Sequence, residues 1–242
     1  MKDCNYPLLP RIIAHRGNSS EAPENTLSAI KSALELHPDA IEIDLHLSKD
    51  GEFVVMHDGE INRTTNGQGA ILNYTLNELK QFDAGSWKNP AFKGEPIPTF
   101  WEVLNEVKGK SRLFVEMKIV GAEEQLLSTL KKADMLDDVV IISFYPQVLA
   151  KLAELSPNLP RAVLTGAESF EDFVKVAEAA KTRALDLYHL NLHRDVAEKL
   201  LDRSYLLYAW TVDEEEHMKR AVDIGITGIT TNRPRKALEL FR

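Results

Sequence analysis

The sequence predicts a (β/α)₈ TIM barrel with a small insertion after the second strand. Its 242 residues suit one such barrel, which typically needs about 250 residues. Short apolar runs alternate with segments of helical periodicity along most of the chain. Chemically unusual residues follow several of these runs, and TIM barrels carry their chemistry at the carboxyl ends of the strands. We therefore expect one domain over residues 1–242, which includes a hairpin and an insertion at 46–98.

The first βα unit begins with the apolar run 12–14, which predicts a short buried strand. The strand ends at His15 and Arg16, and a loop follows. Asn25 is the expected N-cap of the first helix, because an asparagine side chain accepts hydrogen bonds from the free N–H groups at a helix start. Apolar residues then recur at helical spacing at Leu27, Ile30, Ala33 and Leu34.

The stretch 41–47 alternates strictly between apolar and polar residues, which is the period of a strand. Glu42 and Asp44 therefore point to the same side, roughly 7 Å apart along the strand. If that side faces the inside of a closed barrel, burial and mutual repulsion both oppose ionisation of the two acids. A bound cation is the simplest remedy.

The segment 53–57 is expected to return antiparallel to this strand. The linker 48–52 is too short for a parallel crossover, which needs about a dozen residues or more, so the connection is a hairpin. The hairpin brings His57 beside the two acids. Residues 59–98 are polar and glycine-rich, with one short helix expected at 75–82, and we interpret them as an insertion rather than a second domain.

Regular alternation of helices and strands resumes at residue 99. Helix starts are expected at Thr99, Ser169, Asp195 and Asp213, each with an acid three residues later, and Pro234 falls in the first turn of the last helix. The further strands are expected at 113–118, 139–144, 161–165, 184–190, 205–211 and 226–231. Without the return strand of the hairpin, eight parallel strands remain, the number that closes a TIM barrel.

Glu116 and Lys118 lie two apart on one of these strands and therefore share a face. Glu116 thereby joins Glu42 and Asp44 as a third inward acid. Carboxylate oxygens suit a hard divalent cation, Mg²⁺ or Ca²⁺, rather than zinc. The alternative is that Glu116 only pairs with Lys118, but three inward acids favour a metal site.

His15 and His57 converge on the same carboxylates, and histidine exchanges protons near neutral pH. A lone histidine at a strand end is more often structural, but two that converge favour catalysis. Arg16 and Lys118 suit a phosphate group, and the alternative for both is charge balance for the acids. Trp210 either lines a substrate pocket or plugs the barrel mouth, and we favour the pocket.

The remaining aromatic and imidazole side chains receive no catalytic role. Phe144 is expected to pack. The other histidines are expected at the surface or in packing contacts, and they are His37, His46, His189, His193 and His217.

The composition restricts the kind of protein and its partners. Apolar residues make up 44% and charged residues 27%, as in ordinary globular proteins with a full core. The net charge of −8 argues against a nucleic-acid partner. It remains compatible with a small anionic substrate that binds in a local basic pocket. Cys4 is the only cysteine, so no internal disulfide is expected. Residues 1–10 do not resemble a signal peptide and no apolar run suits a membrane span, so we expect a cytoplasmic protein.

Taken in order, several short motifs resemble the glycerophosphodiester phosphodiesterase family. The match runs from Ile12 to about Pro234, and its joint order and spacing are highly specific. The motifs are His15-Arg16-Gly17, Pro23-Glu24-Asn25-Thr26, Glu42-Ile43-Asp44, His57-Asp58, Arg63-Thr64-Thr65-Asn66-Gly67, Glu116-Met117-Lys118 and Trp210-Thr211-Val212.

The resemblance implies a metal-dependent hydrolase that cleaves glycerophosphodiesters to glycerol 3-phosphate and an alcohol. It implies a TIM barrel with a small inserted segment, a glycerol hydroxyl as first nucleophile, and a cyclic phosphate intermediate. Each of the motif residues would then have a role: Glu42, Asp44 and Glu116 as metal ligands, His15 and His57 as acid and base, and Arg16 and Lys118 as phosphate ligands.

Two positions depart from the commonest pattern of that family. Asp213 stands where asparagine often follows Trp-Thr-Val, and Asn232 stands where aspartate often precedes the final proline. Both lie outside the metal and histidine set.

Two other functions fit the same barrel. A lysophospholipase D would need an apolar channel for an acyl chain, and the polar insertion gives little sign of one. A catalytically silent phosphodiester-binding protein would be expected to lack at least one of the five acids and histidines, and all five are present.

Overall fold

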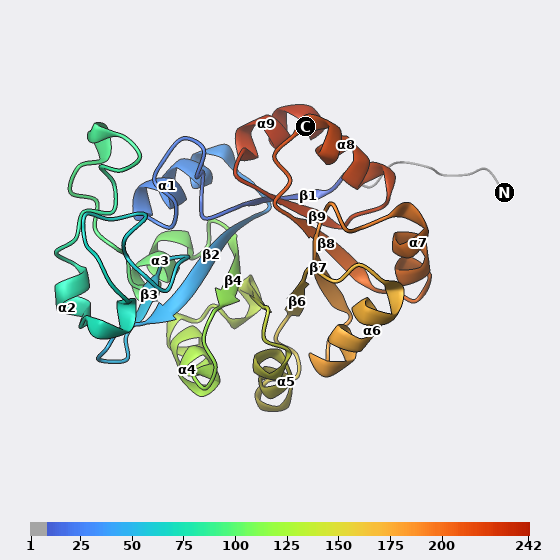
Figure 1. Ribbon diagram of the computed structural model, residues 1–242, viewed down its shortest axis with the longest axis horizontal. Helices are drawn as coiled ribbons and strands as arrows, with labels where there is room; N and C mark the ends of the chain where they lie inside the picture. The colour runs from blue at the N-terminus through green and yellow to red at the C-terminus, as the bar shows by residue number, and fades with distance from the viewer. Residues whose placement is uncertain (1–8) are drawn as a thin grey trace.

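Eight parallel strands close into a barrel in the computed structural model, which describes residues 9–242 (Figure 1). Hydrogen bonds between β1 and β2 complete the ring. The barrel strands are β1 (Arg11–Ala14), β2 (Ala40–Leu47), β4 (Arg112–Met117), β5 (Val139–Ser143), β6 (Arg161–Thr165), β7 (Ala184–Tyr188), β8 (Leu206–Trp210) and β9 (Gly228–Thr231). The predicted TIM barrel is confirmed.

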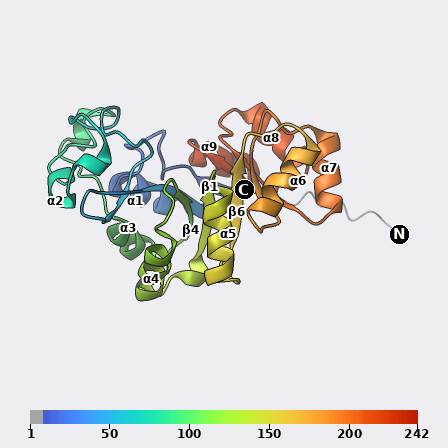
Figure 2. The same cartoon turned by 60° about the horizontal axis from the view of Figure 1, so that its bottom comes forward.

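Helices follow the strands and surround the barrel, as Figures 1 and 2 show. They are α1 (Leu27–Leu36), α3 (Phe100–Val107), α4 (Glu123–Ala133), α5 (Pro146–Leu155), α6 (Phe170–Ala179), α7 (Arg194–Asp202), α8 (Glu215–Asp223) and α9 (Pro234–Phe241). Thr99 and Glu102 form the predicted capping box of α3, and Pro234 is in the first turn of α9.

The expected helix starts are partly confirmed. Ser169 caps α6 with its side chain, as predicted. The prediction for α7 was wrong, because the helix begins at Arg194 and Asp195 lies inside its first turn. The prediction for α8 was also wrong, because the helix begins at Glu215 and the carboxylate of Asp213 accepts other hydrogen bonds.

The predicted hairpin is present, since β3 (Phe53–Val55) pairs antiparallel with β2. The insertion that follows lies beside α1 and α3 (Figure 2) and contains the short helices η1 (Ile71–Asn73), α2 (Leu76–Leu79) and η2 (Pro90–Phe92). It has its own cluster of buried apolar side chains, namely Val54, Met56, Ile61, Ile71, Leu79, Ala84 and Ile97. This small core holds the insertion against the edge of the barrel.

The alternation of β2 divides its side chains between two layers. Ile41, Ile43 and Leu45 belong to the large core between barrel and helices. On the other face, Ala40 packs with the apolar side chains of the barrel interior. The acids of β2 follow Ala40 on that inner face, toward the carboxyl end of the strand.

No helix within residues 9–242 is long and apolar enough to cross a membrane. Cys4 and the other residues up to position 8 lie outside the described part of the chain, so the prediction about the cysteine stays a prediction.

Candidate active site

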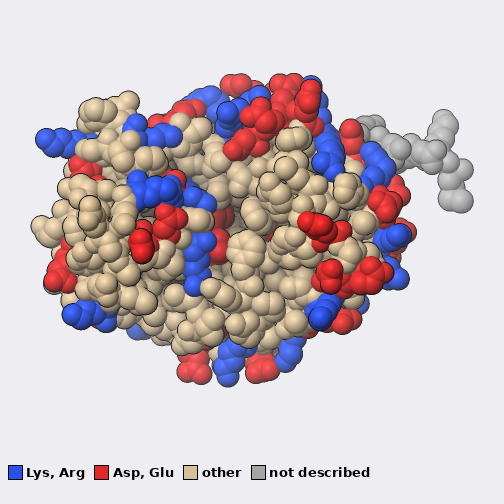
Figure 3. Space-filling view, in the orientation of Figure 1, with Lys and Arg blue, Asp and Glu red and all other residues tan. Residues whose placement is uncertain are grey.

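A pocket of about 100 Å³ opens at the carboxyl ends of the barrel strands. Figure 3 shows a hollow near the middle of one face, with charged side chains on one side of it and mostly uncharged surface on the other. Six of the eight predicted site residues line this pocket, and Asp44 and Lys118 join them through ion pairs. The complete lining is His15, Arg16, Glu42, His57, Glu116, Ile142, Phe144, Leu164, Asp186, Trp210, Thr211 and Thr230.

The three predicted metal ligands lie together and are buried. Each of Glu42, Asp44 and Glu116 offers one carboxylate oxygen, and these oxygens lie within 4.8 Å of one another. Burial, and then the charge of Asp44, raises the pKa of Glu42 well above its usual range and raises that of Glu116 to about 7. Two of the three carboxyl groups are therefore held in an environment that disfavours their charge.

Two cations face Asp44, the acid in the middle of the cluster. Arg16 Nε lies 3.3 Å from its Oδ2, and Lys118 Nζ lies 3.2 Å from its Oδ1 and 2.8 Å from Glu116 Oε1. Burial alone would raise the pKa of Asp44, but Lys118 and Arg16 outweigh burial and hold it well below its ordinary value. The pairing of Glu116 with Lys118 that we weighed as an alternative is thus present.

The cluster nevertheless fits a divalent cation. Asp44 Oδ1 is buried, and within residues 9–242 its partner is the ammonium group of Lys118 at 3.2 Å. Three converging carboxylates supply the all-oxygen set that Mg²⁺ or Ca²⁺ prefers.

Asn25 holds the other oxygen of Asp44, a role that sequence reasoning missed. Its Nδ2 donates to Asp44 Oδ2 over 2.7 Å, and its backbone lies in the left-handed region at φ 58°. The predicted N-cap role was wrong, because Thr26 caps α1 and accepts from the N–H of Ala29. Asparagine tolerates left-handed backbone, which was the one available signal in the sequence.

The turn after β1 has a tight local geometry. Gly17 has a φ of 81°, and a Cβ atom there would lie 2.6 Å from the carbonyl carbon of Ala29. Only glycine is therefore accommodated. Arg16 just before it is also left-handed, at φ 55°, and its backbone N–H donates to Glu42 Oε2 over 3.0 Å. The turn thus brings the guanidinium and a backbone donor to the acids.

His57 is oriented by its sequence neighbour. Its Nδ1 lies 2.6 Å from Asp58 Oδ1, and Arg63 Nε donates to Asp58 Oδ2 over 2.6 Å. Burial raises the pKa of Asp58, but these two partners outweigh burial and lower it to about 2. Because a carboxylate only accepts hydrogen bonds, His57 Nδ1 is the donor and Nε2 carries the lone pair of the neutral ring.

His15 has a corresponding arrangement on the other side of the acids. Its Nδ1 lies 2.7 Å from Asn232 Oδ1, and its Nε2 lies 3.8 Å from Glu42 Oε2. Burial, and then the charge of Arg16, lowers the pKa of His15 to about 4. The ring is therefore neutral near pH 7.

A sequence profile of the Glycerophosphoryl diester phosphodiesterase family matches residues 15–236. The chain belongs to this family. A "Glycerophosphodiester phosphodiesterase" of Caldanaerobacter subterraneus subsp. tengcongensis is 37% identical over 96% of this chain and 97% of its own length. A protein of the same name from Bacillus subtilis is 35% identical over 92% of this chain and 83% of its own.

Solved structures agree with this assignment. An Oleispira antarctica phosphodiesterase in complex with the product sn-glycerol-3-phosphate superimposes with a TM-score of 0.87 and 29% identity over 97% of this chain and 98% of its own. A glycerophosphodiester phosphodiesterase of Thermotoga maritima gives a TM-score of 0.79 and 25% identity over 96% of this chain and 98% of its own. The family places this chain among the phosphoric diester hydrolases.

The other side of this family member's pocket is aromatic. Trp210 lines the pocket, its Nε1 donates to the carbonyl oxygen of Asp186 over 3.1 Å, and its ring lies 5.5 Å from that of Phe144 and 5.3 Å from that of Tyr188. Phe144 packs against Trp210 as expected, and its side chain also lines the pocket and is 44% exposed. Phe144 directly follows β5 at the carboxyl end of the barrel.

Asp186 is a second residue that sequence reasoning missed. It lines the pocket, is buried, and neither carboxyl oxygen has a hydrogen-bond partner in the described part of the chain. Burial, and then the charge of Glu116, raises its pKa to about 8. The signal in the sequence was an acid within the otherwise apolar strand β7.

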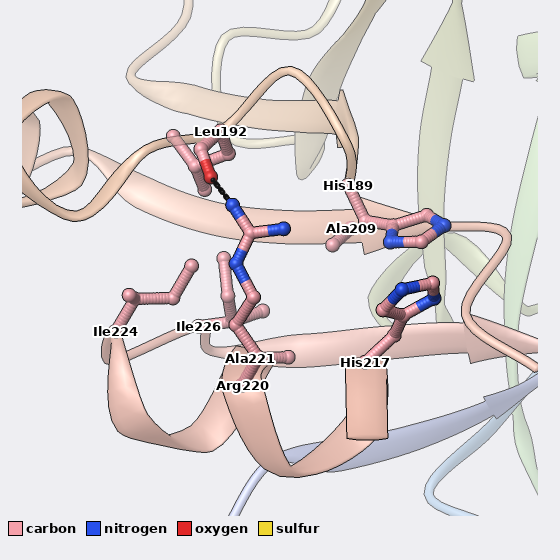
Figure 4. A pocket seen from close by; sticks show the side chains of 8 residues that line it. All are labelled: His189, Leu192, Ala209, His217, Arg220, Ala221, Ile224 and Ile226. Carbon is pink, nitrogen blue, oxygen red and sulfur yellow. Dashed lines mark hydrogen bonds between the residues drawn. The ribbon is translucent and has the colours of Figure 1, made fainter. Parts of the chain in front are cut away.

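His189 lies in a separate cavity of about 10 Å³ (Figure 4), which is lined by His189, Leu192, Ala209, His217, Arg220, Ala221, Ile224 and Ile226. Its ring packs against that of His217 at a tilt of 52°, with 4.8 Å between centroids, and Arg220 donates to the carbonyl oxygen of Leu192. Burial, and then His217 and Arg220, lowers the pKa of His189 to about 4. These contacts support the predicted packing role of His189.

Proposed function

We propose that this protein hydrolyses glycerophosphodiesters to glycerol 3-phosphate and an alcohol, and that a divalent metal ion is required. The observation that carries the proposal is the buried cluster of Glu42, Asp44 and Glu116, with one histidine on either side, at the mouth of the barrel. The names of the relatives and the product bound to the Oleispira antarctica structure support the substrate class.

In this proposal Glu42, Asp44 and Glu116 hold Mg²⁺ or Ca²⁺. When bound, the ion supplies positive charge that neutralises the phosphodiester and lowers the pKa of an attacking oxygen. Arg16 and Lys118 bind the remaining phosphate oxygens, because both already point cationic groups at the acid cluster and hydrogen-bond well to phosphate. Trp210 shapes the part of the pocket that takes the glycerol.

His15 and His57 exchange the protons of the reaction. Both rings hold their Nδ1 against an acceptor, which leaves Nε2 as the nitrogen that exchanges protons with the substrate. One histidine enters neutral and takes the proton of the attacking hydroxyl on Nε2. The other enters as the imidazolium, with a proton on each nitrogen, and gives its Nε2 proton to the oxygen of the departing alcohol. If the 2-hydroxyl of glycerol attacks first, phosphorus passes through a cyclic phosphate, which water then opens to glycerol 3-phosphate.

The test is release of glycerol 3-phosphate from a panel of glycerophosphodiesters, with Mg²⁺, with Ca²⁺ and with a chelator. We expect turnover of glycerophosphocholine or glycerophosphoethanolamine that is lost on chelation and returns with metal. A 2-deoxy analogue of glycerophosphocholine tests the internal nucleophile, which contributes about 7–11 kcal/mol when well oriented. Binding of the panel without turnover would instead identify a catalytically silent binding protein.

A lysophospholipase D activity is the second candidate, because exposed apolar side chains lie in loops at the carboxyl end of the barrel, the end at which the pocket opens. Val120 is 57%, Leu190 44% and Tyr145 42% exposed, and each follows a barrel strand at its carboxyl end. These residues come from the loops after β4, β5 and β7 and not from the polar insertion. Lysophosphatidylcholine in the same panel decides between the two substrates.

A further inference from the structure

The two positions at which the chain departs from the commonest family pattern are in direct contact. Asn232 Nδ2 donates to Asp213 Oδ2 over 2.7 Å, although the residues lie 19 positions apart. The other oxygen of the carboxylate, Asp213 Oδ1, accepts from the backbone N–H of Asn232 at 2.8 Å and from Thr231 Oγ1 at 3.0 Å. Asp213 is therefore held on both of its oxygens.

This contact fixes which way the amide of Asn232 points. A carboxylate only accepts hydrogen bonds, so Asp213 binds the NH₂ group of Asn232 and turns the amide oxygen toward His15. Ser19 Oγ lies 2.9 Å from that oxygen and 2.7 Å from the carbonyl oxygen of His15. A hydroxyl both donates and accepts, so Ser19 accommodates either orientation, and Asp213 alone selects one.

The orientation of the amide in turn decides the tautomer of His15. An amide oxygen accepts a hydrogen bond, so the nitrogen 2.7 Å away, Nδ1, carries the proton of the neutral ring. Nε2 then keeps its lone pair on the side of Glu42. If the amide were turned around, its NH₂ group would face Nδ1 and the proton would move to Nε2.

We propose that Asp213 and Asn232 are a pair of positioning residues that hold His15 with its proton on Nδ1. The inference rests on the proposed role of His15 in catalysis. With asparagine at 213 and aspartate at 232, the amide would donate to the carboxylate, and the carboxylate would accept from His15 Nδ1. The two arrangements give the same tautomer. Asparagine at both positions does not, and aspartate at both would set two carboxylates against each other.

The critical variant is Asp213→Asn. The amide oxygen of the new asparagine still accepts from the backbone N–H of Asn232 and from Thr231. The NH₂ group of residue 213 therefore takes the place of Oδ2 and faces the NH₂ group of Asn232. Asn232 then turns around and presents its NH₂ group to His15. The double variant D213N/N232D restores an acceptor toward His15. Asp195→Asn, at an exposed position on α7, is the matched control.

The experiment measures turnover of glycerophosphocholine by the metal-loaded enzyme and ¹⁵N shifts of histidine-labelled protein, with His15 assigned from the His15→Ala spectrum. For D213N we expect a fall in kcat of about 10²-fold or more with little change in KM, since proton transfer contributes that much. We also expect the ¹⁵N shifts of His15 to report protonation of Nε2. D213N/N232D should recover most of the kcat and the original shifts.

Two results would overturn the inference. One is that the double variant D213N/N232D has a kcat no higher than that of D213N, although both variants have the melting temperature of the wild type and of D195N. The other is an unchanged His15 tautomer in D213N. Asn232→Ala, which removes the acceptor of His15 Nδ1, should shift the tautomers of His15 toward a mixture and provides a second shift change to measure if D213N folds poorly. The shifts do not depend on activity, so absence of turnover with the expected shifts contradicts the proposed function and leaves the positioning pair standing.

Discussion

At the scale of single residues, the two histidines differ in the partner that holds Nδ1. Asp58 is a carboxylate that is itself paired with Arg63, whereas the partner of His15 is the neutral amide of Asn232. A carboxylate stabilises a protonated imidazole more than an amide does. The structure thereby gives two chemically distinct histidines around one set of acids, as an acid and base pair requires.

Replacing either histidine should stop turnover without unfolding the protein. For His15→Ala and for His57→Ala we expect losses in kcat of about 10²–10⁴-fold, because proton transfer is removed. Melting temperature and metal binding should stay near wild type, as in the control His193→Ala at an exposed position. A variant that melts early but turns over normally per folded molecule would show that its histidine is structural.

Asp186 should make stability depend on pH. Burial raises the pKa of Asp186 to about 8 in the folded protein, against an ordinary value of 3.8. Between these two pH values the folded state keeps the proton of Asp186, whereas the unfolded state has lost it. The contribution of Asp186 to the free energy of unfolding is therefore most favourable below the unfolded-state pKa. It falls as the pH rises toward the folded-state pKa, by up to about 1.4 kcal/mol per pH unit. Asp186→Asn removes this loss.

We expect the advantage of Asp186→Asn over wild type to grow between about pH 5 and pH 8, in melting curves recorded with chelator present. Asp195→Asn, whose carboxyl group is exposed, should show no such trend. An advantage of Asp186→Asn that is equal at both pH values would mean that Asp186 has an ordinary pKa.

At the scale of elements, the side chain of Arg63 joins the insertion to residues that contact the candidate site. Arg63 donates to both oxygens of Glu24, over 2.9 and 2.7 Å, and to Asp58. Glu24 accepts in turn from Arg16 Nη1 at 2.8 Å. Through Arg63 the insertion therefore orients the partner of His57 and the partner of Arg16.

Removing this link should reduce activity more than stability. For Arg63→Met we expect kcat/KM to fall by about 10–100-fold, the effect typical of residues that orient site ligands. The side chain is 45% exposed, so the loss of stability should stay within about 1 kcal/mol. Lys181→Met breaks an exposed pair with Glu154 far from the site and serves as the control. Activity equal to that of the control would show that the insertion does not position the site.

At the scale of the whole molecule, a metal that binds only the folded protein should raise its melting temperature. The expected stabilisation is about 2.7 kcal/mol at a metal concentration one hundred times the dissociation constant. Chelation should lower the melting temperature and abolish turnover, and Mg²⁺ or Ca²⁺ should restore both. In Glu42→Gln both responses should weaken, whereas Glu154→Gln at an exposed position should behave as wild type. If Glu42→Gln keeps the metal response, Glu42 is not a ligand.

The sequence by itself determined the barrel, the hairpin and the candidate chemistry. These follow from patterns that are local along the chain: the alternation of 41–47 places two acids on one face, and the short linker 48–52 forces the antiparallel return. The carboxyl ends of parallel strands meet at one end of a barrel, so residues that follow different strands were expected to converge. His15 and Glu116 do so.

Only the tertiary structure decided which partners hold these residues. Asn25 and Asp44 lie 19 positions apart, Arg63 and Glu24 lie 39 apart, and His15 and Asn232 lie 217 apart. The sequence predicted that Asn25 and Asp213 each start the helix that follows them. In the structure their side chains instead form hydrogen bonds with residues that are distant in the sequence. The physical reason is that a buried polar group must be satisfied by whichever group the closed barrel brings within hydrogen-bond distance, and sequence spacing does not encode that distance.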